Sequence, residues 1–92
     1  MAEQTQIERV RRYIEENIMD VGYVRKCVDS DFIDALIALL LNDDIHYSSR
    51  IYNVDDDWFI IHVWYPGFGG DWALAIKVVD GDLDECWYFE TG

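Results

Sequence analysis

The segment WFIIHVWY, residues 58–65, is an almost unbroken run of aromatic and β-branched side chains. A run of this length and composition favours a β-strand that is buried on both faces, as in the middle of a sheet. Residues 72–79, WALAIKVV, form a second clear strand after a glycine-rich loop. The Asp80-Gly81 turn then predicts a hairpin that leads into a last strand near Cys86–Phe89.

Two further strands and two helices are expected upstream of this run. Residues 45–54 are rich in Tyr, Ser and Ile and predict a strand, which an acidic turn at 55–57 joins to the central one. Residues 23–28 alternate in character and predict a short first strand. Apolar residues recur every three or four positions over 5–20 and again over 32–41, so both segments predict helices.

Both predicted helices have recognisable ends. Thr5-Gln6-Ile7-Glu8 has the spacing of a capping box, and Gly22 is the residue expected to end the first helix. Asp29-Ser30 supplies N-cap chemistry for the second helix, and Asn42-Asp43-Asp44 should break it. Because apolar residues occupy nearly all positions of the second helix, we expect it to be largely buried.

The order helix, strand, helix and four strands predicts an α+β fold (α-β-α-β-β-β-β), with two helices packed on one mostly antiparallel five-stranded sheet. The 92 residues should form one domain, 1–92, since there are no repeats or linkers. The longest apolar run, Ala35–Leu41, is far shorter than the ~20 residues that a membrane span needs. We therefore expect a cytoplasmic protein that does not bind membranes.

The chain is strongly acidic, with 19 Asp and Glu residues against seven Lys and Arg residues and a formal net charge of −12. The whole excess lies in residues 27–92, where only Arg50 and Lys77 are basic. Such a field repels phosphate, so ordinary binding of nucleic acid is excluded and a basic partner is expected. Carboxylates along a strand edge and a helix end can imitate the phosphates of DNA. A solvated acidic face that only keeps the domain soluble has the same composition.

Metal or enzymatic chemistry has little support in the sequence. Cys27 and Cys86 are too few for a disulfide framework and are expected to be reduced. With His46 and His62 they are possible zinc ligands, but the spacing lacks the close pairs of zinc motifs. The acids of residues 80–85 lack the spacing of a calcium loop. We therefore expect no cofactor and no enzyme; the alternative is a small enzyme or metal module with a titrating Cys27 or His62 at a cleft.

Three segments resemble the bacteriophage uracil-DNA glycosylase inhibitor family. They are Asp44-Ile45, then after a gap of 26 residues Trp72-Ala73-Leu74-Ala75-Ile76, and the Asp80-Gly81 turn. That family has an Asp-Ile, a similarly spaced Trp-Ala-Leu-x-Ile strand and an Asn-Gly hairpin. The order of its elements is also similar, and Asp29-Ser30 stands where the family has a Glu-Ser step. The likeness spans about residues 23–89.

The resemblance implies a stoichiometric protein inhibitor that binds uracil-DNA glycosylase one-to-one by imitating DNA, in the host cytoplasm if a bacteriophage encodes it. The residues that would imitate phosphates are Asp29, Ser30, Asp31 and Asp34. An apolar pocket between the second helix and the sheet would capture the side chain that the enzyme wedges into DNA. The residues that would line this pocket are Ile33, Leu36, Ile37, Tyr47 and Ile60.

The chain also departs from the family. Asp29 is one methylene shorter than the family's Glu, and the link from Ser30 to the helix is several residues shorter. His62 falls where the pocket wall should be apolar, and Tyr65 stands where the family has an acid. These departures leave open an acidic decoy for another nucleic-acid enzyme, such as a CRISPR effector, a restriction enzyme or a toxin nuclease, which would need no pocket.

Overall fold

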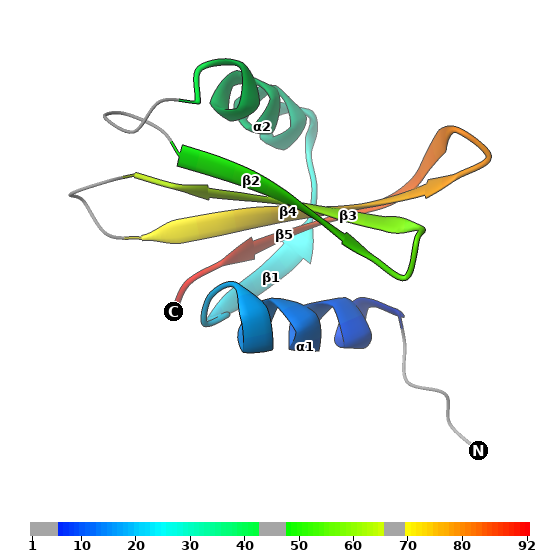
Figure 1. The fold of residues 1–92 in the computed structure, drawn as a ribbon, viewed down its shortest axis with the longest axis horizontal. Helices are drawn as coiled ribbons and strands as arrows, with labels where there is room; N and C mark the ends of the chain where they lie inside the picture. Colours follow the sequence, from blue (N-terminus) through cyan, green and yellow to red (C-terminus); the bar gives the residue numbers. More distant parts are fainter. Residues whose placement is uncertain (1–5, 43–47, 66–69) are drawn as a thin grey trace.

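The computed structural model describes residues 6–42, 48–65 and 70–92, and it confirms the predicted α+β fold. Figure 1 shows a single twisted sheet with α2 above it and α1 below it. Neither helix in the described part of the chain is long and apolar enough to cross a membrane. The elements in chain order are α1 (Gln6–Asn17), β1 (Tyr23–Lys26), α2 (Asp29–Leu40), β2 (Ser48–Val54), β3 (Trp58–Trp64), β4 (Asp71–Val79) and β5 (Asp82–Glu90).

The five strands form one antiparallel sheet in the order β1-β5-β4-β3-β2. Strands β2 to β5 pair in chain order, whereas β1 crosses to the far side and pairs with β5, where Tyr23 lies opposite Glu90. The predicted interior position of β3 is confirmed. Asp80 and Gly81 have φ angles of 52° and 83°, as expected for the tight turn between β4 and β5.

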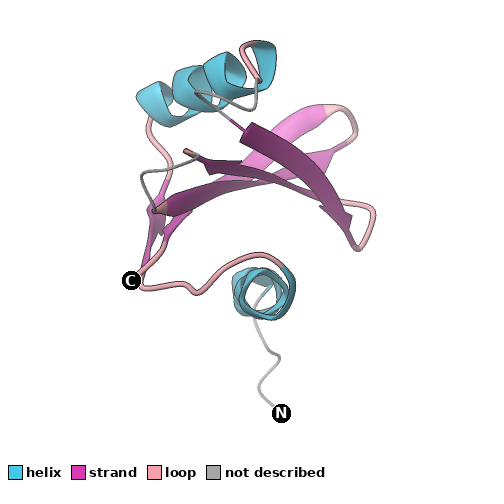
Figure 2. Ribbon diagram, turned by 60° about the vertical axis from the view of Figure 1, so that its left-hand side comes forward, coloured by secondary structure: helices cyan, strands magenta, loops and turns pink. Residues whose placement is uncertain are grey.

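The two helices cover opposite faces of the sheet (Figures 1 and 2). On one face, Ile14 of α1 packs in a cluster that includes Ile60 of β3. On the other face, Ala35 and Ala38 of α2 pack in a cluster that includes Ile61. Because successive side chains of a strand point to opposite faces, the neighbours Ile60 and Ile61 belong to different cores.

The ends of the helices differ from the prediction. The first helix ends at Asn17, and Gly22 instead donates its N–H to Glu90 O over 2.8 Å beside β1. The N-cap of α2 is Val28, so Asp29 lies inside the first turn of the helix. Thr5 and the predicted breaker at 43–44 lie outside the described residues.

Candidate protein-binding site

A two-residue link between β1 and α2 places three of the predicted partner-binding residues on the surface. Asp29 and Ser30 are exposed in the first turn of α2, and Asp34 is exposed one turn further along the helix. Carboxylates at this end of a helix are favoured by the unpaired backbone N–H groups and the helix dipole. Since α2 contains no Lys or Arg, no basic residue of the helix itself neutralises these carboxylates.

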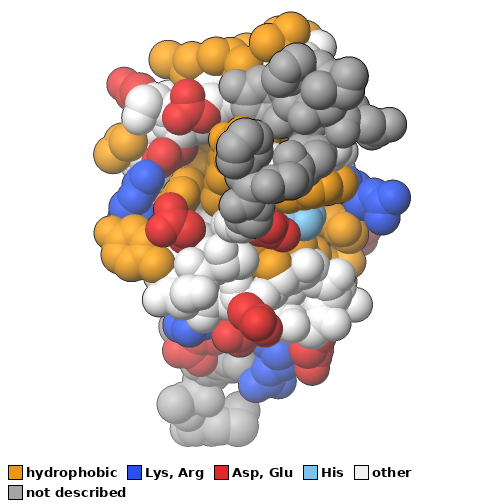
Figure 3. Space-filling view, turned by 90° about the vertical axis from the view of Figure 1, so that its left-hand side faces the viewer, with side chains coloured by type: hydrophobic (Ala, Val, Ile, Leu, Met, Phe, Trp, Pro, Cys, Tyr) orange, Lys and Arg blue, Asp and Glu red, His pale blue; other side chains and the backbone are white. Residues whose placement is uncertain are grey.

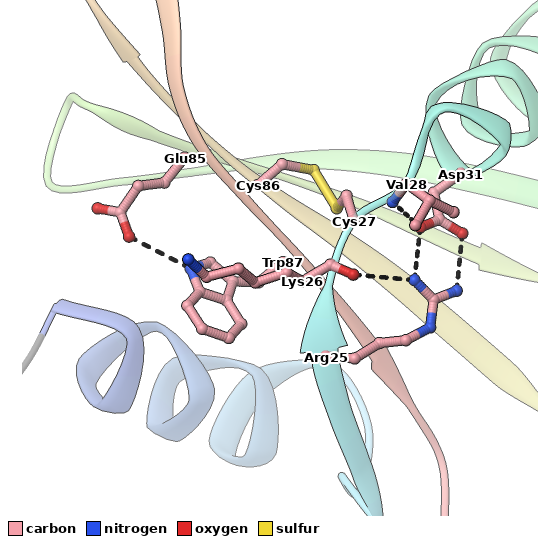
Figure 4. Close-up of a disulfide and its surroundings, with 8 residues drawn as sticks. All are labelled: Arg25, Lys26, Cys27, Val28, Asp31, Glu85, Cys86 and Trp87. Carbon is pink, nitrogen blue, oxygen red and sulfur yellow. Dashed lines mark hydrogen bonds and ion pairs between the residues drawn. A yellow bond between two sulfur atoms is a disulfide. The ribbon is translucent and has the colours of Figure 1, made fainter.

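Asp31 is turned inward and is only 5% exposed, which corrects its expected role as a phosphate mimic. Arg25 of β1 donates to it through Nη1 (2.7 Å to Oδ2) and Nη2 (2.9 Å to Oδ1), and the Val28 N–H donates to Oδ2 over 2.8 Å (Figure 4). The Arg25 hydrogen bonds, helped by the Val28 N–H, hold the pKa of Asp31 below its usual range. This carboxylate therefore caps α2 and ties it to β1, and both of its oxygens are already engaged by these hydrogen bonds.

The pocket expected from the resemblance is not formed by the residues named for it. Ile60 is fully buried in the core between α1 and the sheet, on the face of the sheet opposite α2. Ile33, Leu36 and Ile37 are 58%, 56% and 39% exposed and lie on the outer face of α2. Tyr47 lies outside the described residues. The structure therefore brings three of the five residues together, but on an open surface instead of inside a pocket.

The reason lies in the side of α2 that meets the sheet. Ala35 and Ala38 are buried there, with Phe32 and Leu39 packed at the margin. Ser49 of β2 donates its hydroxyl to Ala38 O over 3.3 Å. Because alanine side chains are short, the helix lies close to the sheet, and the larger apolar side chains are turned outward. The expectation that the second helix is largely buried is therefore wrong for its outer face.

A cleft of about 360 Å³ lies beside the N-terminal half of α2. Trp72 stacks on Tyr88 with ring centroids 5.8 Å apart and donates its indole N–H to Tyr65 Oη over 3.3 Å. The guanidinium of Arg25 lies 4.2 Å from the centre of the Tyr88 ring. The cleft brings three predicted residues together with an aromatic wall; its lining is Arg25, Ser30, Asp31, Asp34, Tyr65, Trp72 and Tyr88.

Sequence reasoning did not assign Arg25 or Tyr88 to this site. The register of β1 against β5 places these two residues opposite each other, although 63 positions separate them in the sequence. The Tyr88 hydroxyl donates to Glu90 Oε2 over 2.6 Å. Burial, with a further contribution from Glu90, raises the pKa of Tyr88 well above its usual range, so this phenol stays neutral. In the sequence, Arg25 was marked only by the alternating character of residues 23–28, which predicts a strand there but not its partner.

Cys27 and Cys86 form a disulfide just beyond the end of β1, with their Cα atoms 5.4 Å apart (Figure 4). The two residues lie opposite each other, and the Cys27 N–H donates to Cys86 O over 3.1 Å. The expectation of two reduced thiols is therefore wrong, because the pairing of β1 with β5 brings distant cysteines together. In this form neither sulfur is available as a thiolate ligand for zinc.

Two further candidates for metal or catalytic chemistry are paired with other side chains, and His46 lies outside the described residues. His62 Nε2 lies 2.9 Å from Asp71 Oδ2, and the imidazole stacks on Trp64 at 4.7 Å. Asp84, one of the acids weighed for calcium, lies 3.7 Å from the ammonium of Lys77. In residues 6–42, 48–65 and 70–92, no group of three or more His, Cys, Asp or Glu side chains is placed to hold a metal ion.

Comparisons with protein-family models, with curated proteins and with solved structures found no match. The function is therefore inferred from the charge of the chain and from its exposed side chains.

Proposed function

We propose that this protein is a stoichiometric inhibitor of a DNA-binding enzyme, that it acts by DNA mimicry, and that its target is a uracil-DNA glycosylase. The observation behind this proposal is that α2 combines exposed carboxylates, Asp29 and Asp34, with an exposed apolar face in a chain of net charge −12. Lys and Arg side chains that contact DNA phosphates would pair with these carboxylates.

Charge and apolar contact have separate roles in this mechanism. The negative field steers a basic enzyme toward the inhibitor and speeds association, as complementary charge does in other complexes. Apolar side chains buried on contact slow dissociation. Since the pocket between α2 and the sheet is not formed as expected, the apolar contact with the enzyme would be made by Ile33, Leu36 and Ile37 on the outer face of the helix.

The named target is supported by the short segments that resemble the glycosylase inhibitor family. The order of the helices and strands agrees with what that resemblance implies for the fold. A second candidate, an acidic decoy for another nucleic-acid enzyme, is favoured by one observation. Ile60 lies on the face of the sheet opposite α2, and a decoy needs no pocket between them.

Inhibition of a bacterial uracil-DNA glycosylase tests the proposal directly. Uracil release from DNA should stop at one equivalent of inhibitor and should depend little on moderate salt, because part of the contact is apolar. Asp29→Asn with Asp34→Asn should weaken inhibition by about tenfold. The matched control is Asp56→Asn, an exposed acid in the turn between β2 and β3. Undiminished uracil release at a tenfold excess of protein rejects the glycosylase and leaves the broader decoy proposal.

A further inference from the structure

We infer that the outer face of α2 is the docking surface for a basic, amphipathic helix of the partner protein. This inference deepens the proposed function, and it rests on that function in requiring a protein partner. It does not depend on which DNA-binding enzyme the partner is. Four observations on the described residues support it.

The first observation is the contrast between the two helices, which have the same length of 12 residues and cover opposite faces of the sheet. The outer face of α1 is charged, with Arg9, Arg12 and Glu16 exposed. The outer face of α2 is apolar, and Figure 3 shows apolar side chains gathered over α2 at the top of the molecule. Its exposed large side chains are Ile33, Leu36, Ile37, Leu40 and the C-cap Leu41. A contiguous exposed patch of this kind marks a binding surface.

The second observation is the spacing of these residues. Ile33, Leu36, Ile37 and Leu40 stand at positions i, i+3, i+4 and i+7 of a regular helix. In helix pairs this stripe is the seam along which the side chains of one helix fit between those of the other. The sheet already packs against the opposite side of α2, through Ala35 and its neighbours. The seam is therefore without a partner in the described part of the chain.

The third observation is that the face of the sheet on which α2 lies also has exposed apolar side chains. Phe59 is 38% exposed and points to the face that α2 covers, since it is two residues from Ile61 in β3. Ile51 of β2 lies opposite Ile61 in the register and is 54% exposed on the same face. Exposed apolar side chains on this side of the molecule are therefore not confined to α2.

The fourth observation is the charge around the seam. No Lys or Arg occurs between Lys26 and Arg50 in the sequence, whereas Asp29 and Asp34 are exposed on α2 itself. A second copy of this chain would bring two identical acidic helices and two charges of −12 together, which is unfavourable. A partner helix with Lys or Arg beside its apolar stripe would match both the seam and the carboxylates.

A designed peptide provides the probe. It is a helix of about 18 residues, built from Leu and Lys with one apolar stripe, and its binding is measured by calorimetry. We expect one-to-one binding that persists at high salt, and at least a tenfold loss of affinity in the variant Leu36→Gln with Leu40→Gln. These positions are exposed, so the variant should keep its fold, which circular dichroism checks. The matched control is Val79→Gln with Leu83→Gln, two exposed apolar residues at the hairpin of β4 and β5.

Three results would overturn the inference. The α2 variant could bind the peptide as tightly as the parent protein does, or a peptide of the same composition in scrambled order could bind equally well. Sedimentation could instead reveal a dimer that Leu36→Gln with Leu40→Gln dissolves, which would assign the seam to a second copy. Inhibition of the glycosylase is measured separately. Peptide binding without inhibition rejects the glycosylase as the target and leaves the docking surface. Full inhibition by the variant Leu36→Gln with Leu40→Gln rejects the docking surface and leaves the target.

Discussion

Removal of the Cys27–Cys86 disulfide should strongly destabilise this fold. The two cysteines are 59 positions apart, so the bond closes most of the chain into one loop in the unfolded state. In the chain-entropy model, loss of a cross-link over a loop of this size costs about 4 kcal/mol. A domain of this size has a total free energy of unfolding of only roughly 5 to 14 kcal/mol. The disulfide therefore contributes a large part of the stability of the oxidised protein.

Urea unfolding followed by tryptophan fluorescence measures this contribution. Addition of a phosphine reductant should lower the urea midpoint by roughly 2 to 4 M, given the ordinary denaturant sensitivity of small domains. The matched control is the variant Cys27→Ser with Cys86→Ser, whose midpoint should equal that of the reduced protein and should ignore the reductant. Reduction of the disulfide should also lower the midpoint of thermal unfolding, Tm, by about 15 to 30 °C.

The reasoning depends on the cross-link between β1 and β5 being present in the folded protein. Equal midpoints with and without reductant, together with free thiols in the untreated protein, would refute it. A shift in the double variant but not on reduction would assign the effect to the serine side chains instead of the bond.

Three further predictions concern the helix cap, the two faces of the sheet and the buried phenol. Asp31→Asn should lower the free energy of unfolding by about 2 kcal/mol, because it weakens charged hydrogen bonds with Arg25. Since the pKa of Asp31 is lowered in the folded protein, this stabilisation is complete above the ordinary carboxyl pKa and is lost as the pH falls through the folded-state pKa. The urea midpoints of parent and variant should therefore converge in acid. Ile60→Ala should lower the free energy of unfolding by about 3 kcal/mol, whereas Leu36→Ala should change it by less than about 0.5 kcal/mol. Similar losses for the two variants in urea unfolding would contradict the placement of Ile60 in the core and of Leu36 on the surface. Tyr88 should ionise at a higher pH in the folded protein than in urea, because its pKa is raised, and tyrosinate absorbance followed in both states measures this difference.

The sheet could be predicted from the sequence because its signals are local. Aromatic and β-branched residues of 58–65 favour a buried strand, and the Asp80-Gly81 turn fixes the hairpin that follows. The contacts of β1 could not be predicted in this way. Its pairing with β5, and with it the disulfide and the Arg25–Tyr88 contact, joins residues about 60 positions apart, and no local pattern encodes that choice.

The candidate site was predicted only in part, for a reason that α2 makes clear. The spacing of Ile33, Leu36 and Ile37 correctly placed them on one face of a helix. A helix that is apolar all round does not reveal which face its own sheet covers. Ala35 and Ala38 meet the sheet because their small side chains allow close approach, so the larger residues face outward. Ile60 was assigned to the wrong face because a shift of one residue along a strand reverses the direction of its side chain.

The position of β1 also affects how the chain acquires its fold during synthesis. Tyr23–Lys26 is synthesised about 60 residues before Trp87–Glu90, the part of β5 that pairs with it in the described sheet. The edge of the sheet therefore stays open until nearly the whole domain has been translated, and long-range pairing of this kind slows folding. Chaperones that shield unpaired strands would have longest access to this edge, and a ribosome stalled before residue 87 would hold a chain whose first strand has no partner.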